Sequence, residues 1–205
     1  MFNITVSILI GYFFGSFQSS YILGRLVKKI DIRKYGTSNA GASNATMVLG
    51  FKYGILTFLL DVTKIIISYN LLYILFKQNN LSHMGALSAI LGHNFPFYLN
   101  FKGGKGVASF LGFFFCIDVF FGLSLSFMIF LFALISNYIS LAGIFLYIIG
   151  PFIIWFKIRN FYILIYSIIV CLIGIYLHRT NIEKILNGKE KKLREFIYEK
   201  LNKQK

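Results

Sequence analysis

The stretch at residues 92–106 combines the residue types that bind phosphate. It ends in Lys102-Gly-Gly-Lys-Gly106, so three glycines and two lysines occupy five positions. Glycine lets backbone N–H groups turn toward one point and lysine adds positive charge, and both favour an anionic ligand such as phosphate. A Walker A loop is not predicted, because Gly106 stands where Ser or Thr should follow the lysine. The candidate phosphate ligands are His93, Lys102, Gly103, Gly104, Lys105 and Gly106, with backbone N–H groups of residues 103–106.

A second polar stretch, at residues 36–44, reads Gly-Thr-Ser-Asn-Ala-Gly-Ala-Ser-Asn. Its small hydroxyl and amide side chains offer many neutral hydrogen-bond donors with little bulk. A cradle for phosphate or for an oxyanion needs donors of this kind. The candidate ligands are Ser38, Asn39, Gly41, Ser43 and Asn44.

The third stretch begins at His178 and reads His-Arg-Thr-Asn-Ile up to Ile182. If the helix before it continues, His178 and Asn181 are three positions apart and share a face. They would then meet a substrate hydroxyl and a phosphate together. A separate charged pair, Asp61 and Lys64, lies inside an apolar segment, where charges are normally paired or functional. Mutual neutralisation is the simpler interpretation of that pair, which makes it structural.

Each polar stretch also has a plainer interpretation that the sequence leaves open. Lys102 and Lys105 are residues that anchor topology at a membrane surface, and His93 fits a hydrogen-bonded packing histidine. Residues 36–44 fit an ordinary turn with helix-capping Ser and Asn. Arg179 and Lys184 fit a membrane-interface cap with snorkelling side chains.

The composition predicts an all-α, polytopic integral membrane protein with a single domain, residues 1–205. The chain is 57% hydrophobic and 14% charged, whereas soluble domains have about 25% charged residues. The net charge of +14 does not indicate nucleic-acid binding in so hydrophobic a chain, and fits basic loops beside anionic headgroups. Cys116 and Cys171 lie in apolar runs without metal-ligand spacing, so we expect inert thiols, no disulfide and no metal.

The apolar segments predict about seven transmembrane helices, because a crossing needs roughly 20 residues. The first has no basic leader before it, so we expect a retained span. Gly11 and Gly15 form a small-xxx-small pair that allows another helix to approach closely. The expected spans are 2–24, 53–76, 83–99 and four within 106–178, separated at 122–126, 136–138 and 157–160.

The distribution of Lys and Arg predicts the orientation. With the N-terminus outside and the C-terminus cytoplasmic, residues 25–52, 100–106 and 179–205 hold six, two and nine basic residues inside, against three outside. The positive-inside rule favours this arrangement strongly. It places all three polar stretches on the cytoplasmic face and makes residues 179–205 a basic cytoplasmic tail, which is expected to include a surface helix.

Together, these stretches resemble the bacterial acyl-phosphate:glycerol-3-phosphate acyltransferase family, whose members are membrane-integral. Each piece alone is weak, but the order and spacing agree over nearly the full chain. The matching pieces are Gly15-Ser16, residues 31–44, Leu60-Asp-Val-Thr-Lys64, Leu91-Gly-His-Asn-Phe-Pro96, Phe101-Lys-Gly-Gly-Lys-Gly-Val-Ala108, residues 178–182 and Gly188-Lys-Glu190.

The resemblance implies a seven-helix enzyme of the bacterial cell (inner) membrane with its active site facing the cytoplasm. Its reaction would move a fatty acyl group from acyl phosphate to the 1-hydroxyl of sn-glycerol 3-phosphate, giving lysophosphatidic acid and phosphate, the first acylation of phospholipid synthesis. No cofactor or metal is implied, and the soluble enzyme that makes acyl phosphate is an implied partner. By motif position, Ser38, Asn39, Ser43 and Asn44 fall in the first active-site loop, Lys105 on the catalytic lysine, His178 and Asn181 on the closing motif, and Glu190 on a structural glutamate.

Four positions depart from the family pattern. Gln18 stands where proline is frequent, Ser43 where threonine is usual, and Ile65 where a glycine follows Lys64. Most importantly, Met47 stands where the family has a functional arginine. An arginine fork binds phosphate bidentately and methionine cannot. Either Arg33 or another cation substitutes, or affinity or activity is reduced.

Two other functions and one chemical choice stay open at this point. The alternative function is a small transporter or channel for an organic phosphate, which polar residues across the membrane midplane would favour; here only Asp61 and Lys64 lie that deep. Met47 fits a homologue that binds lipid without catalysis. The general base is either His178 or a phosphate oxygen of a substrate. The sequence shows no serine–histidine–acid triad and no His-x4-Asp box, so a covalent acyl-enzyme is not expected.

Overall fold

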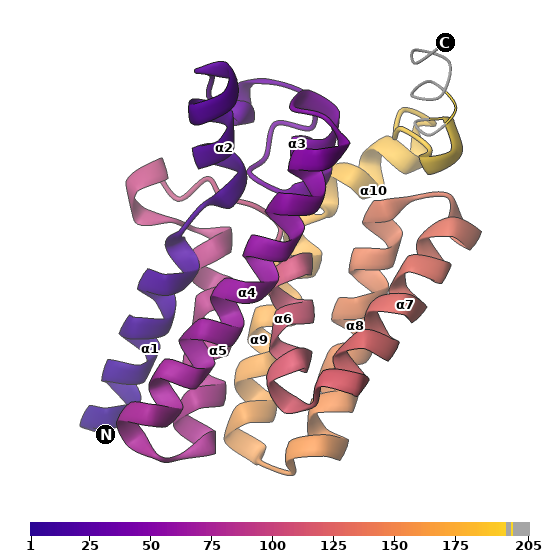
Figure 1. Ribbon diagram of the computed structural model, residues 1–205. Coiled ribbons are helices and arrows are strands. Elements are labelled where there is room, and N and C mark those ends of the chain that lie inside the picture. Colours follow the sequence, from indigo (N-terminus) through magenta and orange to yellow (C-terminus); the bar gives the residue numbers. More distant parts are fainter. Residues whose placement is uncertain (196–197, 199–205) are drawn as a thin grey trace.

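The computed structural model describes residues 1–195 and residue 198, and every regular element in this part of the chain is a helix. The long helices pack side by side into one bundle (Figure 1). The all-α fold predicted from composition is confirmed. The elements are α1 (Phe2–Ser16), α2 (Ser19–Lys28), η1 (Ile32–Lys34), α3 (Ala42–Val48), α4 (Phe51–Phe76), α5 (Asn79–Asn94), η2 (Phe97–Leu99), α6 (Val107–Ile117), α7 (Val119–Ser136), α8 (Ile139–Ile158), α9 (Phe161–Leu177) and α10 (Arg179–Leu186).

Small residues bring α1 and α5 into backbone contact. A side chain at Gly11 would collide with the carbonyl of Gly85, and one at Gly15 with the carbonyl of Ala89. Between lipid-embedded helices there is little hydrophobic driving force, so close van der Waals packing has to stabilise their association. The close approach predicted for the Gly11–Gly15 pair is confirmed, and α5 is its partner.

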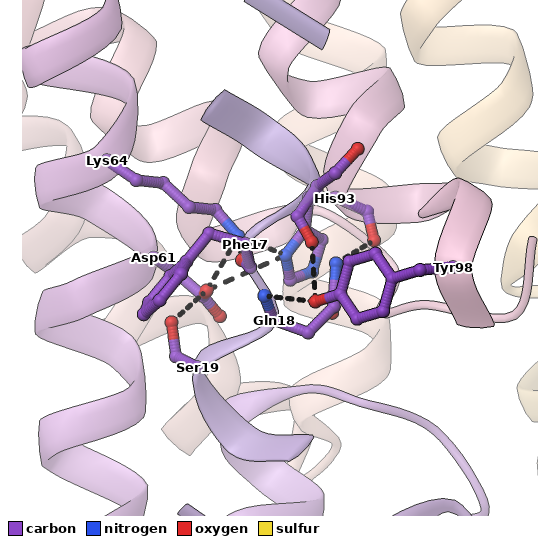
Figure 2. Close-up of polar contacts among 8 residues, drawn as sticks. Phe17, Gln18, Ser19, Asp61, Lys64, His93 and Tyr98 are labelled. Carbon is purple, nitrogen blue, oxygen red and sulfur yellow. Dashed lines mark hydrogen bonds and ion pairs between the residues drawn. The ribbon is translucent and has the colours of Figure 1, made fainter. Parts of the chain in front are cut away.

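The first helical segment is broken at Phe17 and Gln18, where the sequence predicted an uninterrupted span over 2–24. The break exposes backbone groups that a continuous helix would have paired, and side chains from elsewhere in the chain replace those bonds (Figure 2). Lys64 donates to the carbonyl of Phe17 (2.8 Å), and Tyr98 donates to the carbonyl of Ser16 (3.0 Å). The N–H of Gln18 donates in turn to the hydroxyl of Tyr98 (3.2 Å). These hydrogen bonds stabilise the break, and α2 starts directly after it.

The boundary between α6 and α7 lies at Asp118, and the break predicted at 122–126 is wrong. Helix α7 runs through those residues without interruption. Asp118 has an extended backbone, and its carboxylate accepts from the N–H of Phe121 (2.6 Å) as an N-cap. An N-cap carboxylate satisfies a free N–H at the helix start and interacts favourably with the helix dipole. The Asp118 cap therefore sets the start of α7, and Gly122 and the serines that follow it do not break the helix.

Two other expected boundaries also differ. The expected segment 83–99 is α5, which starts at Asn79 and ends at Asn94, followed by a separate short helix, η2. Residues 25–52, expected as a loop, contain the end of α2, η1 and α3. The short helices of this region pack around Ile32, Ala45 and Leu49 as a small apolar cluster of their own.

Within the described residues, four helical units are long and apolar enough to cross a membrane: Phe2–Lys28, α4, α7 and α8. A fifth is α9 with α10, if this pair, bent by 42°, is counted as one span. Helices α5 and α6 have 16 and 11 residues, fewer than the roughly 20 that a straight crossing needs. Seven crossings therefore stay a prediction.

The bundle has two different ends. Figure 1 shows α2, α3 and α10 together at one end, with the N-terminus at the other. The main core lies between them and is rich in aromatic side chains, among them Phe110, Phe113, Phe114 and Tyr147. All three polar stretches singled out in the sequence gather at the end that carries α2, α3 and α10. Part of the predicted tail, residues 196–197 and 199–205, lies outside the described residues.

Candidate active site

The glycine-rich turn is fastened to the end of α5. Gly103 donates its N–H to the carbonyl of Asn94 and Gly104 to that of His93, both at 3.1 Å. These carbonyls belong to the last turn of α5, where helical partners run out. Neither glycine has room for a side chain, because His93 and Asn94 fill the space. A phosphate would have to compete with these carbonyls for the N–H groups of Gly103 and Gly104. The phosphate-binding hypothesis therefore depends mainly on Lys105.

Lys105 connects the glycine-rich turn to the C-terminal motif. Its ammonium donates to the amide oxygen of Asn181, and its carbonyl accepts from the hydroxyl of Tyr147 (2.7 Å). The amide nitrogen of Asn181 donates to Glu190 (2.6 Å), which also accepts from Ser140 (3.0 Å). Glu190 thereby fixes which way the Asn181 amide faces, with its oxygen toward Lys105.

Burial lowers the pKa of the Lys105 ammonium to about 8. The Glu190 carboxylate opposes this shift, whereas the positive charges of Lys184 and Arg179 lower the pKa further. A half-buried ammonium among other cations is poorly solvated and poorly neutralised. An anion beside Lys105 would replace the lost solvation, so this environment favours the phosphate ligand predicted from the sequence, which stays a prediction.

His178 lies at the junction of α9 and α10 and is buried. Its Nδ1 lies 2.8 Å from the carbonyl of Gly174. A carbonyl only accepts, so Nδ1 carries the proton and Nε2 of the neutral ring is the free acceptor. The ring packs edge-on against Tyr147 at 6.1 Å between centroids. Nε2 faces Gly143, where a side chain would lie 3.1 Å from it. This tautomer is the one a general base requires.

The first polar stretch is organised by Asn44. Its amide nitrogen donates to the carbonyls of Ile32 (2.9 Å) and Asn39 (2.8 Å), and its oxygen accepts from the N–H of Thr37 (2.8 Å). The side chain is fully buried. These bonds fold residues 32–44 into a compact loop, so the geometry favours an organising role for Asn44 over direct contact with a ligand.

Ser38 and Asn39 lie at the accessible part of this loop. Ser38 is exposed and has a φ of 58°, an uncommon value for a non-glycine residue. The loop meets the glycine-rich turn through Ala40, whose N–H donates to the carbonyl of Gly103 (3.2 Å). Backbone held in a sparsely populated conformation is frequent at functional sites. Ser38 is thereby placed two residues from the junction of the two loops.

These contacts bring the three polar stretches into one connected site. Ala40 joins the first stretch to the second, and the Lys105–Asn181 bond joins the second to the third. The side chain of Lys102, by contrast, is exposed at the edge of the turn. Among the described residues, no cluster of His, Cys, Asp or Glu is arranged to hold a metal ion.

The model of the glycerol-3-phosphate acyltransferase family matches residues 5–188. The chain belongs to the glycerol-3-phosphate acyltransferase family. A glycerol-3-phosphate acyltransferase of Fusobacterium nucleatum subsp. nucleatum is 37% identical over 193 residues, covering 91% of this chain and 96% of the relative. One of Alkaliphilus metalliredigens is 34% identical over 193 residues, covering 94% and 97%. The resemblance inferred from the motifs is confirmed.

The fold of this acyltransferase-family chain is also that of a solved structure. The crystal structure of PlsY (YgiH), an integral membrane glycerol 3-phosphate acyltransferase in its glycerol 3-phosphate form, superimposes with a TM-score of 0.83 at 32% identity, covering 92% of this chain and 94% of that one. Its lysophosphatidic acid form gives a TM-score of 0.82 at 30% identity. The prediction that the chain belongs to a family of integral membrane acyltransferases is confirmed.

The site also contains residues of this acyltransferase-family chain that sequence reasoning missed. Tyr147 packs between the glycine-rich turn and His178, and Ser140 helps Glu190 to hold Asn181. Both lie in a long apolar run, which gives no local signal of a site. Gly143 and Gly174 make room for the rings of His178 and Tyr147, and only the packing reveals that purpose.

Arg33 is not free to substitute for the family arginine that is replaced by Met47 in this chain. Its guanidinium donates to both carboxylate oxygens of Asp31 and to the carbonyls of Leu99 and Lys102, at 2.8–3.1 Å. These bonds tie the first loop to the second. Met47 is half-buried on α3, one turn after Ser43. Substrate binding by Arg33 would break the bonds that hold the loops together.

Proposed function

We propose that this protein transfers a fatty acyl group from acyl phosphate to the 1-hydroxyl of sn-glycerol 3-phosphate. The products are lysophosphatidic acid and inorganic phosphate. Membership of the acyltransferase family gives the acceptor, and the chemistry of the site supports acyl phosphate as donor. The observation that carries the proposal is the bond from Lys105 to Asn181, because it joins the glycine-rich turn to the closing motif around a poorly neutralised cation.

Acyl phosphate is an activated mixed anhydride, so positioning and charge neutralisation matter more than a potent nucleophile. The hydroxyl oxygen attacks the carbonyl carbon, the bond from that carbon to the phosphate oxygen breaks, and phosphate leaves with the bonding electrons. The hydroxyl proton goes to Nε2 of His178 or to a phosphate oxygen. Holding both reactants in register contributes roughly 7–11 kcal/mol to lowering the barrier.

The site residues are assigned roles on this basis. Lys105 neutralises a substrate phosphate, and His178 and Asn181 orient the glycerol phosphate. Ser38 and Asn39, with Ser43 and Gly41 beside them, hold phosphate or the carbonyl oxyanion. A donor aimed at a developing oxyanion is worth about 3–4 kcal/mol. Asn44 and Glu190 hold the loops that carry these groups.

The fatty acyl chain is assigned to the apolar surface between α1 and α4. A groove of about 460 Å³ lies there, lined mainly by apolar side chains, and Lys64 is part of its wall. Lys64 contacts His93, which packs against the glycine-rich turn. Lys64 and His93 thus link the apolar groove to the turn of the proposed phosphate site. Its lining residues are Phe13, Phe14, Phe17, Leu60, Thr63, Lys64 and Ile67.

We place the protein in the bacterial cell membrane, with the N-terminus outside and the site facing the cytoplasm. The basic residues of the 25–52, 100–106 and 179–195 segments support this orientation through the positive-inside rule. Seven crossings, an odd number, agree with an N-terminus and an α10 helix at opposite ends of the bundle.

The test uses purified protein in lipid nanodiscs with acyl phosphate and glycerol 3-phosphate, and measures released phosphate and lysophosphatidic acid. Turnover with acyl phosphate, and none with acyl-CoA, is expected. Failure to turn over where a related acyltransferase is active would reject the function. Flux of glycerol 3-phosphate into vesicles without acylation would favour the transporter instead.

A further inference from the structure

A buried charged cluster lies beside the site and is unexplained by the proposed reaction (Figure 2). The ammonium of Lys64 contacts three acceptors: Asp61 at 2.9 Å, the carbonyl of Phe17 at 2.8 Å and Nδ1 of His93 at 2.7 Å. Asp61, Lys64 and His93 are almost inaccessible to solvent. The predicted neutralisation of Lys64 by Asp61 is confirmed, but neutralisation alone does not explain the contact with His93.

These three contacts determine which nitrogen of His93 carries a proton. An ammonium has three N–H donors and no acceptor. The Asp61 carboxylate and the Phe17 carbonyl take two of the donors, so the third is directed at Nδ1 of His93. Because Nδ1 accepts, the ring proton lies on Nε2. The ion pair keeps the buried cluster neutral overall, which favours the ammonium over the free amine.

His93 contacts the glycine-rich turn through both its ring and its backbone carbonyl. A side chain at Gly104 would collide with Nε2 of His93, so the ring occupies that space. The carbonyl of His93 accepts from the N–H of Gly104 (3.1 Å) and from the side chain of Gln18 (2.8 Å). The next residue after Gly104 is Lys105. The position of His93 therefore sets where the turn and its lysine lie.

The same cluster fixes the break between α1 and α2. Ser19, the first residue of α2, donates to the carboxylate of Asp61 (2.9 Å), and Lys64 donates to the carbonyl of Phe17. Gln18 makes two bonds that a proline at this position could not make: its N–H donates to the hydroxyl of Tyr98, and its side-chain amide donates to the carbonyl of His93. One buried cluster thus couples the break to the turn that carries Lys105.

We propose that Asp61 and Lys64 are positioning residues that hold His93 as the Nε2–H tautomer and, through its ring, keep the turn of Gly103, Gly104 and Lys105 in place for a substrate phosphate. The identity of that phosphate as glycerol 3-phosphate or acyl phosphate rests on the proposed function. The positioning itself does not, because it is visible in the protein without substrate.

The first experiment uses two readouts that need no turnover. The chain has three histidines, so 15N-histidine spectra are resolvable and His93→Asn assigns the signal. We expect an unprotonated Nδ1 and a protonated Nε2 in the wild type, and a loss of this single tautomer in Lys64→Met. Hydrogen exchange of residues 100–107 should increase at least tenfold in the same variant. A wild-type Nδ1–H tautomer, or unchanged exchange in folded Lys64→Met, would overturn the proposal.

A double variant separates positioning from charge neutralisation. Replacing both members of a buried ion pair leaves no unpaired buried charge, so Asp61→Leu combined with Lys64→Met is expected to fold, with a Tm lowered by the lost bonds to Ser19 and to the Phe17 carbonyl. It still lacks the donor to His93, and the turn should remain rapidly exchanging. Wild-type exchange in the double variant would show that only charge balance matters. Lys77→Met, on the exposed end of α4, controls for loss of a cation.

Kinetics give the third readout. If the protein is an acyltransferase, the double variant should raise KM for a phosphate substrate at least tenfold, with kcat within about threefold of wild type. An unchanged KM would overturn the proposal. A wild type without turnover would reject the proposed function, and the spectra and exchange data would still decide the positioning.

Discussion

Lys105 donates a hydrogen bond to Asn181 across 76 positions of the chain. One residue lies on the glycine-rich turn after α5, and the other in the first turn of α10. Glu190 and Ser140 hold the amide so that its oxygen faces the lysine. The amide oxygen solvates the ammonium without neutralising it, and this leaves charge for a substrate.

Lys105→Met should abolish most of the activity and preserve the fold. Methionine is similar in length and apolar, so packing is retained, while the charge that we propose neutralises phosphate is lost. We expect the rate of phosphate release to fall about a hundredfold or more. Lys77→Met removes an exposed cation far from the site and should keep the wild-type rate. A wild-type rate for Lys105→Met would exclude this lysine from the reaction.

The rate should depend on pH through Lys105. Because its pKa is lowered to about 8 by burial, the ammonium is present below that pH and is lost as the pH rises through it. The value of kcat/KM, which reports the free enzyme, should fall tenfold per pH unit above about 8. Lys184 lowers this pKa, so Lys184→Gln should move the falling limb to higher pH. A limb that stays in place would contradict the assignment to Lys105.

Alanine variants of Asn44 and Asn39 should differ in whether they lower the stability of the protein or its activity. Asn44→Ala removes three hydrogen bonds of a buried side chain, to Thr37, Ile32 and Asn39, which costs about 1–3 kcal/mol. A lower Tm by fluorescence-detected size exclusion is expected. Asn39→Ala loses one side-chain bond, to Thr37, and should keep the Tm but lower the rate. The reverse pattern would exchange their roles.

Met47→Arg should strengthen substrate binding. The family resemblance places a functional arginine here, and position 47 lies one turn after Ser43 on α3. A guanidinium fork binds phosphate bidentately, so KM for a phosphate substrate should fall severalfold. Met47→Lys adds charge without the fork and should give a smaller gain. If neither variant changes KM, this face of α3 does not border the site.

Some of the molecule was predictable because its cause is local in the sequence. Apolar segments indicated helices in a membrane, and Gly11 and Gly15 indicated a close helix contact that α5 provides. The error at residues 122–126 arose because glycine and serine were weighted over Asp118, whose cap starts α7. The break at Phe17 and Gln18 was missed because its stabilising groups, Lys64 and Tyr98, come from distant segments.

The sequence by itself determined the all-helical membrane class, the residue types able to bind phosphate, and the charge asymmetry that favours one orientation, since each follows from composition or short-range spacing. Only the tertiary structure decided that Lys105 meets Asn181, that Tyr147 packs against His178, and that Asn44 and Arg33 hold the loops. The physical reason is that hydrogen bonds between distant residues depend on how the helices pack, which no local pattern specifies.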